Sequence, residues 1–117
     1  MNFRDAGTKA EELAVEYLEA QGYSIVKRNF TFGKVGEVDI ICKHNQTLIF
    51  VEVKARTNKE FGSPESAITP KKMKALRRCA EGFLYIRNIT DIECRFDVIA
   101  IDFSMHPHEI RHLINAF

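Results

Sequence analysis

Two strand-like segments separated by a short polar turn constrain this sequence more than any other feature. Residues 36–43 and 48–56 are rich in β-branched and apolar side chains, and the polar segment 44–47 lies between them. This pattern is typical of a β-hairpin. If the turn centres on Asn45 and Gln46, residues equidistant from the turn face each other across the two strands.

Two acidic residues of this hairpin face each other in that register. Asp39 lies opposite Glu52, and the opposed Cβ atoms of such a pair are about 4.5–5.5 Å apart. Two carboxylates at that separation repel each other, whereas a divalent cation between them makes the arrangement favourable. Carboxylate oxygens suit Mg²⁺ or Mn²⁺, which also keep several waters and bind substrate phosphate. The register therefore predicts a divalent-metal site formed by Asp39 and Glu52.

The same register brings a lysine to the predicted site. Lys54 shares a strand face with Glu52, because side chains two residues apart point to the same side, and it faces Glu37. A lysine there can orient the attacking water and stabilise charge that develops on phosphate. In the alternative interpretation, Glu37 and Lys54 form an ordinary cross-strand ion pair and the two acids face water. The apolar run 48–51 favours the metal site, because charged groups in such a strand need compensating partners.

The rest of the chain predicts an α/β fold. The expected elements are a helix over 8–21, strands over 23–32, 36–43 and 48–56, a helix that begins with Thr69 as N-cap and Pro70 in its first turn, a strand over 94–101, and a closing turn or two of helix from about residue 107. A helix between the third and fourth strands is a crossover, so those strands should be parallel. The expected order is αβββαβ(α), with a mixed sheet flanked by helices in one domain of residues 1–117.

Glu11 lies at the border of the apolar face of the first expected helix. From there it can reach the hairpin carboxylates and act as a further metal ligand. Residues 8–11 (TKAE) also fit a capping box, in which Glu11 bonds back to the amide of Thr8. The residues alone leave both interpretations open.

Positive charge is concentrated in one segment, although the net charge is only +1. Residues 71–78 (KKMKALRR) contain five cations and no acid, which predicts either a solvated helix face or a helix that contacts phosphates. Lys72 shares one line of that helix with Leu76 and Ala80, and Arg56, just beyond the hairpin, could also contact phosphate. His108 and His112 are spaced by one helical turn, but no third ligand lies nearby, so a histidine metal site is not favoured.

The cysteines favour a reducing compartment, and the hydropathy favours a soluble protein. The three cysteines include no CxxC pair, which argues against a disulfide framework or a zinc ribbon. No apolar run approaches the ~20 residues of a membrane span, and the first residues lack the apolar stretch of a signal peptide. We therefore expect a soluble, cytoplasmic protein.

Several motifs of the chain resemble the YraN-like family of small bacterial proteins. The match includes Gly7-x-x-Ala10-Glu11, Arg28-Asn29, Gly36-Glu37-Val38-Asp39, Phe50-Val51-Glu52-Val53-Lys54-x-Arg56 and Arg95-Phe96-Asp97-Val98, and it runs nearly from end to end. This family is similar to nucleases of the PD-(D/E)xK type, which have the restriction-endonuclease-like fold, and to archaeal Holliday junction resolvases. Val38 stands where the PD motif has proline.

The resemblance implies a catalytic core and a function. It implies Asp39, Glu52 and Lys54 as the core, Glu11 as the helical glutamate of such nucleases, and Lys72 as the lysine of the second helix. The expected site comprises catalytic Asp39, Glu52, Lys54 and Glu11, whose three carboxylates bind the metal, with Arg56, Lys72 and Glu37 near the substrate.

We expect a Mg²⁺- or Mn²⁺-dependent endonuclease that acts on DNA, with branched or otherwise structured DNA as a candidate substrate. RNA is an alternative target. A protein of this size usually cuts two strands as a symmetric pair, so we expect a homodimer. The alternative function is a non-catalytic nucleic-acid-binding or assembly module that keeps the nuclease fold, since a fold does not establish an activity.

Overall fold

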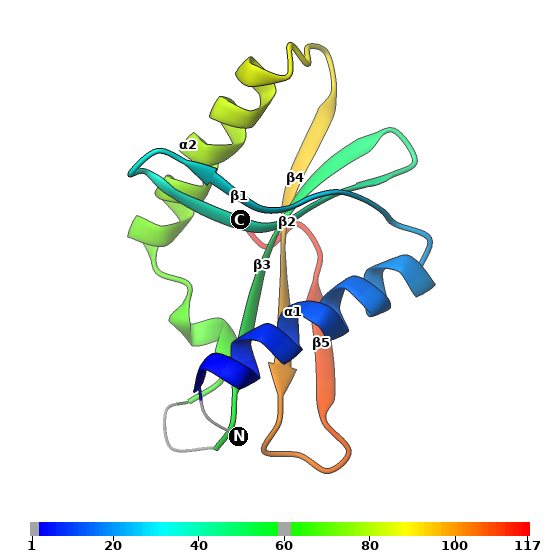
Figure 1. Ribbon diagram of the computed structural model, residues 1–117, viewed down its shortest axis with the longest axis vertical. Coiled ribbons are helices and arrows are strands. Elements are labelled where there is room, and N and C mark those ends of the chain that lie inside the picture. The colour runs from blue at the N-terminus through cyan, green and yellow to red at the C-terminus, as the bar shows by residue number, and fades with distance from the viewer. Residues whose placement is uncertain (1–2, 59–61) are drawn as a thin grey trace.

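A five-stranded mixed sheet with one helix on each face makes up the fold (Figure 1). The structure, a computed structural model, describes residues 3–58 and 62–117, with side chains from residue 6 onward. In chain order the elements are α1 (Phe3–Ala20), β1 (Ser24–Phe32), β2 (Gly36–His44), β3 (Thr47–Arg56), the 3-10 helix η1 (Pro64–Ala67), α2 (Pro70–Ile86), β4 (Glu93–Asp102) and β5 (Glu109–Leu113). The sheet order is β1-β2-β3-β4-β5, and β3 and β4 are parallel while the other pairs are antiparallel. The α/β class and the parallel crossover are confirmed.

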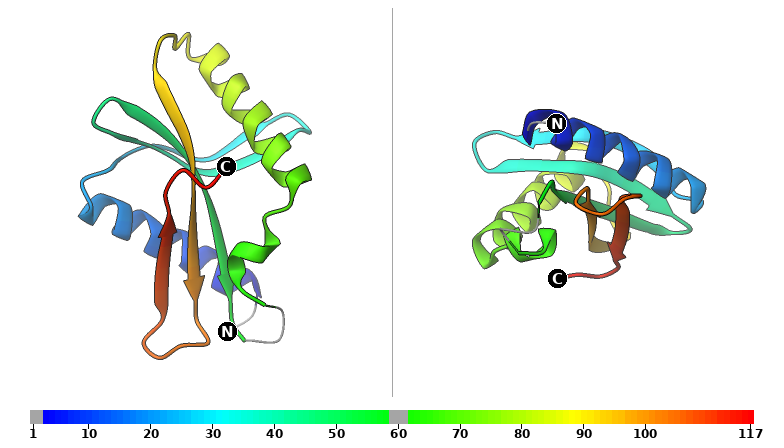
Figure 2. Two further views of the ribbon diagram at one scale, coloured as in Figure 1. Left: turned by 180° about the vertical axis from the view of Figure 1, so that it is seen from behind. Right: turned by 90° about the horizontal axis from the view of Figure 1, so that it is seen from below.

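Each helix buries an apolar stripe against its own face of the sheet, and Figure 2 shows α1 and α2 on opposite sides. The core on the α1 side contains Ala10, Ala14 and Leu18 with Ile40, Cys42, Ile49, Val51, Ile99 and Ile101. The core on the α2 side contains Leu76, Cys79, Ala80 and Phe83 with Val38, Ile41, Leu48 and Phe50. Burial of each large side chain contributes about 1.5–3 kcal/mol, so these two cores fix where both helices lie. Within residues 3–58 and 62–117, no helix is long and apolar enough to span a membrane.

The start of α2 follows the sequence prediction. The Thr69 hydroxyl accepts a hydrogen bond from the backbone N–H of Lys72 at 3.1 Å, and Pro70 occupies the first turn. This cap satisfies one of the free N–H groups that every helix start exposes. It also fixes the first turn of α2, which carries Lys72.

The start of α1 differs from the prediction. The helix begins at Phe3, so Thr8 lies inside it and the capping-box alternative for Glu11 is wrong. Ala6 is 3% exposed and extends the buried stripe of Ala10 by one more turn. This additional packing outweighs the local capping pattern, and it leaves the Glu11 side chain free of any role as a cap.

The predicted closing helix is also wrong, because Glu109–Leu113 form β5. This strand pairs antiparallel with β4, from Asp102 opposite Glu109 to Val98 opposite Leu113. β4 pairs with β3 along its other edge, so its remaining backbone N–H and C=O groups need partners. β5 supplies these partners. This long-range pairing outweighs the helical spacing of the apolar residues in the tail.

A buried polar cluster ties β5 to the rest of the sheet. Asp97 is fully buried and bonds His112 Nε2 at 2.7 Å, Arg95 Nε at 3.0 Å and the backbone N–H of Asn115 at 2.9 Å. The other ring nitrogen of His112 lies 3.1 Å from the Tyr17 hydroxyl, so both nitrogens are engaged. Burial alone would raise the pKa of Asp97, but the hydrogen bonds from His112 and Arg95 outweigh burial and lower it. The cluster thus needs an ionised Asp97.

Replacing Asp97 by asparagine should destabilise the fold. The charged hydrogen bonds that are lost predict a fall in the free energy of unfolding of about 2 kcal/mol at pH 7. Because the pKa of Asp97 is depressed in the folded state, its contribution is present above the unfolded value of 3.8 and is lost as pH falls below it. Urea denaturation of wild type and Asp97→Asn should therefore converge in acid. Asp91→Asn, at an exposed position, is the control, and equal stability of wild type and Asp97→Asn at pH 7 would contradict the role of the cluster.

Candidate functional site

The β2–β3 hairpin has the predicted register near its turn but not at the acidic residues. The ladder runs from His44 opposite Thr47 to Ile40 opposite Val51. Within the described chain, the pairing of β2 with β3 ends there, so the predicted ladder pairs of Asp39 with Glu52 and of Glu37 with Lys54 are not formed. Instead, Asp39 Oδ2 accepts a hydrogen bond from the backbone N–H of Val53 at 2.8 Å. The Asp39 carboxylate thus accepts the N–H that a backbone carbonyl of β2 would accept in a regular ladder.

The pleat of β2 breaks at Asp39. Val38 packs in the core on the α2 side, whereas Ile40 packs in the core on the α1 side. Residues two apart in a regular strand share one face, so the strand changes faces between these two residues. Asp39 lies at the break and points along the sheet toward β3, where it bonds Val53. The sheet therefore opens between β2 and β3, and side chains from both faces can meet.

A cleft of about 540 Å³ lies at this opening. Its lining residues are Gly7, Thr8, Ala10 and Glu11 of α1, Glu37 and Asp39 of β2, Glu52, Val53, Lys54 and Ala55 of β3, and Lys72 of α2. Six of the seven predicted site residues are among them, and the exception is Arg56. In Figure 1 the N-terminal ends of α1 and α2, although on opposite faces, both lie near the end of the sheet at which β2 and β3 diverge.

Glu52 is the most constrained acid of the cleft. It is only 3% exposed, and its Oε2 atom is buried without a hydrogen-bond donor. The nearest cation is Lys72, whose Nζ lies 3.5 Å from Oε2. Burial first, and then the hydrogen bond and negative charge of Asp39, raise the pKa of Glu52 to about 8, against the opposing charges of Lys72 and Lys54. Asp39 and Glu52 thus form the close acidic pair that was predicted, although not as ladder partners.

Glu11 joins this pair from α1. Burial and the charge of Asp39 raise its pKa, while a hydrogen bond from Asn29 and the charge of Arg28 lower it. The Oε1 atom of Glu11 is buried without a hydrogen-bond donor, and Arg28 Nη2 lies 3.7 Å away. The functional interpretation of Glu11 therefore has a structural basis that the capping box lacks.

The donor set of the cleft fits a hard divalent cation. Two buried carboxylate oxygens, one each from Glu11 and Glu52, lack hydrogen-bond donors and line the same cleft. In the part of the chain that the structure describes, His, Cys, Asp and Glu side chains form no group of three or more arranged to hold a metal ion. A closed cage is not required, because Mg²⁺ is usually held by one or two carboxylates together with waters and substrate phosphates. Asp39 and Glu52 would be those carboxylates, with Glu11 acting directly or through water.

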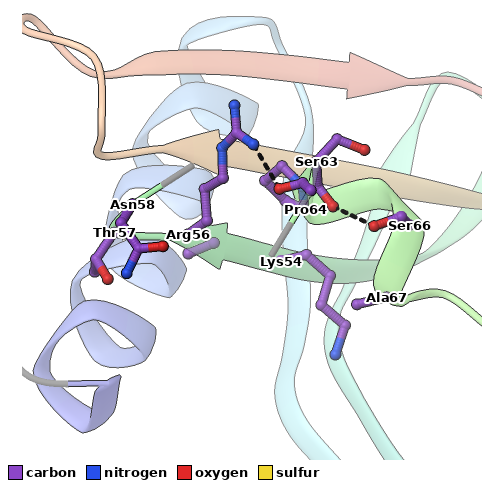
Figure 3. A pocket seen from close by; sticks show the side chains of 10 residues that line it. Lys54, Arg56, Thr57, Asn58, Ser63, Pro64, Ser66 and Ala67 are labelled. Carbon is purple, nitrogen blue, oxygen red and sulfur yellow. Dashed lines mark hydrogen bonds between the residues drawn. The ribbon is translucent and has the colours of Figure 1, made fainter. Parts of the chain in front are cut away.

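Lys54 and Arg56 leave β3 in different directions (Figure 3). Lys54 lines the acidic cleft and, among the described residues, makes no ion pair. The ion pair of Lys54 with Glu37, which the alternative interpretation required, is therefore absent there. Arg56 bonds Asp102 Oδ2 through Nε at 2.9 Å and Nη2 at 2.7 Å, and it lines a neighbouring pocket of about 440 Å³. Its predicted contact with phosphate stays a prediction.

Two residues near the acidic side chains were given no role in the predicted site. Arg28 and Asn29 of β1 both act on Glu11, yet the sequence indicated them only as part of a family motif. The available signal was Asn29 itself, because asparagine is depleted in strands and tolerates positive φ. An asparagine in the middle of an otherwise strand-like segment marks an irregular backbone.

The raised pKa of Glu52 predicts how stability depends on pH in the absence of metal. A carboxyl with a folded pKa of about 8 and an unfolded value of 4.5 favours the folded state below pH 4.5 and loses that contribution as pH rises through 8. Glu52→Gln does not titrate, so its stability relative to wild type should increase between pH 5 and pH 8, by as much as about 1.4 kcal/mol for each unit of pKa shift. Urea denaturation in EDTA tests this, with the exposed Glu81→Gln as control. A difference that does not change with pH would contradict the burial of this charge.

Comparisons with known proteins agree with the motifs. The family described as "Uncharacterised protein family UPF0102" matches residues 10–101. A UPF0102 protein of Syntrophomonas wolfei is 41% identical over 116 residues, which cover 97% of this chain and 98% of the relative. A UPF0102 protein of Caldicellulosiruptor saccharolyticus is 43% identical over 119 residues, which cover 100% of both chains. The resemblance to the YraN-like family is confirmed, and the chain belongs to the UPF0102 family.

Proposed function

We propose that the cleft at the β2–β3 opening hydrolyses phosphodiester bonds with a bound Mg²⁺ or Mn²⁺. The observation that carries this proposal is the buried Glu52 carboxylate beside Asp39, with one oxygen that lacks a donor. Burying a carboxylate without full compensation is costly, and a fold keeps such an arrangement where a cation or a reaction uses it. Two lysines on the same cleft, Lys54 and Lys72, supply the complementary charge for an anionic substrate.

Each residue of the cleft has a distinct part in this proposal. Asp39 and Glu52 would hold the metal, which supplies Lewis-acid stabilisation of the charge that develops on the phosphate oxygens. Glu11 would contribute directly or through a bound water. The ammonium of Lys54, which has no carboxylate partner in the described chain, would orient the attacking water and the phosphate. Lys72 would contact a phosphate oxygen from α2.

The surface around the cleft supports a polyanionic substrate. Lys71, Lys74 and Arg78 are exposed on α2, the helix that brings Lys72 to the site. Such a row of cations near a phosphodiester site fits a nucleic-acid backbone better than a small phosphate ester. We therefore propose an endonuclease that acts on DNA, with branched or structured DNA preferred. We propose that it acts as a homodimer in the cytoplasm, where its three free cysteines stay reduced.

A cleavage panel tests the activity. Linear, nicked, flapped and four-way DNAs and a single-stranded RNA are incubated with wild type, Asp39→Asn and Lys54→Met in Mn²⁺ or in EDTA. Wild type should cleave at least one DNA only with Mn²⁺, and each variant should lose about 100-fold or more of the rate. Lys43→Met, at an exposed position of β2 next to the β2–β3 turn and outside the cleft, should retain most of it.

The other outcomes of the panel are equally informative. Cleavage that survives in both Asp39→Asn and Lys54→Met would place the activity outside this cleft and contradict the proposal. Binding of structured DNA without cleavage by wild type would support the non-catalytic binding module instead. Preferential cleavage of the RNA would replace the proposed substrate.

A further inference from the structure

Asn29 has an unusual backbone conformation for a residue in the middle of a strand. Its φ is 54°, in the left-handed region, although it lies between two residues of β1 that pair regularly with β2. Those residues are Arg28, opposite Ile40, and Phe30, opposite Val38. Only glycine, and less often asparagine or aspartate, visits this region readily. The residue type therefore matches a conformation that most other side chains would strain.

β1 changes faces at Asn29. Arg28 reaches α1, where its Nη2 lies 2.9 Å from Glu12 Oε1, whereas Phe30 packs in the core on the α2 side. Two residues separated by one position would share a face in a regular strand. The left-handed residue between Arg28 and Phe30 accounts for the change, because it rotates the chain without breaking the pairing on either side.

β2 changes faces at the same level of the sheet. Asp39, the residue between the two paired positions Val38 and Ile40, stands across from Asn29, which lies between their partners. The change of face in β2 turns Asp39 toward β3, where it accepts the hydrogen bond from Val53 N. Two neighbouring strands thus twist together, and Asp39 points toward the cleft as a result.

The side chain of Asn29 also acts on the site. Its carboxamide lies close enough to Glu11 to favour the charged form of that acid, which lowers its pKa. Asn29 therefore acts on one proposed metal ligand and sets the backbone opposite another. Glycine would reproduce its backbone but not this interaction, and alanine would reproduce neither.

We propose that Asn29 is a positioning residue of the carboxylate cleft: its left-handed backbone turns Asp39 toward Val53, and its carboxamide holds Glu11 in place. The consequence for metal binding rests on the proposed function. The effect on the backbone does not, because the hydrogen bond from Val53 to Asp39 is a property of the metal-free chain.

Two substitutions separate the two roles of Asn29. Asn29→Gly keeps the left-handed backbone and removes the carboxamide, whereas Asn29→Ala strains the backbone as well. Asn45 provides a matched control, because it has φ 55° in the β2–β3 turn, at the end of the ladder remote from Asp39. Asn45→Gly and Asn45→Ala carry the same chemical changes and the same strain without touching the cleft.

The first measurement is hydrogen exchange of the Val53 amide in EDTA, followed by NMR. Exchange should be about tenfold faster in Asn29→Ala than in Asn45→Ala, and it should be the same in Asn29→Gly as in wild type. Equal Val53 exchange in the two alanine variants would overturn the backbone role. Asn29→Ala and Asn45→Ala carry the same local backbone strain. If only Asn29→Ala fails to fold, the left-handed backbone at residue 29 matters beyond that local strain, and the backbone role is supported. Faster Val53 exchange in Asn29→Gly, whose backbone is unstrained, would overturn it.

The second measurement is Mn²⁺ affinity by calorimetry. Asn29→Gly should bind Mn²⁺ about tenfold more weakly than wild type, as expected when a group that orients a ligand is removed, and Asn45→Gly should match wild type. An unchanged affinity of Asn29→Gly would overturn the role of the carboxamide. If wild type itself binds no Mn²⁺, the proposed function fails, and the exchange of Val53 still decides whether Asn29 positions Asp39.

Discussion

The hydrogen bond from Val53 N to Asp39 Oδ2 is the interaction on which the site depends. Because a side chain accepts this N–H, β2 does not continue its backbone ladder with β3 beyond the pair of Ile40 and Val51. The two strands diverge there (Figure 1), and Glu11 from one face of the sheet lines the same cleft as Lys72 from the other. A regular hairpin would keep these residues on opposite sides of a closed sheet.

The opening brings two carboxyl groups together at a buried position. Glu52 is buried beside Asp39, and the 3.5 Å contact with Lys72 offsets its charge only in part, so its pKa remains high. Two apolar cores and the polar cluster around Asp97 offset the unfavourable burial of Glu52. In that cluster every charge has a partner. The contrast between the satisfied cluster and the unsatisfied cleft distinguishes a structural polar network from a candidate functional one.

Local patterns predicted much of this arrangement. The hairpin register at Asn45 and the cap at Thr69 follow from residues close in sequence, whereas the places of Glu11 and Lys72 in the site were expected from the family resemblance. The strand β5 and the early start of α1 follow from neither, because an unpaired edge of β4 and the packing of Ala6 are long-range demands. The pairing of Asp39 with Glu52 across a ladder also failed, since it assumed a regular pleat. The left-handed Asn29 breaks that pleat, and hydrophobic alternation carries no signal for it.

The most direct test of the metal site is a calorimetric titration of the wild-type protein with Mn²⁺ at pH 8, close to the pKa of Glu52. We predict saturable binding of about one ion per chain at millimolar concentrations or below, weakened by about tenfold or more in Asp39→Asn and in Glu52→Gln. Glu16→Gln, at an exposed position of α1, should bind as wild type does. Absence of saturable binding by the wild-type protein, or equal affinity in Asp39→Asn, would contradict a metal site in this cleft.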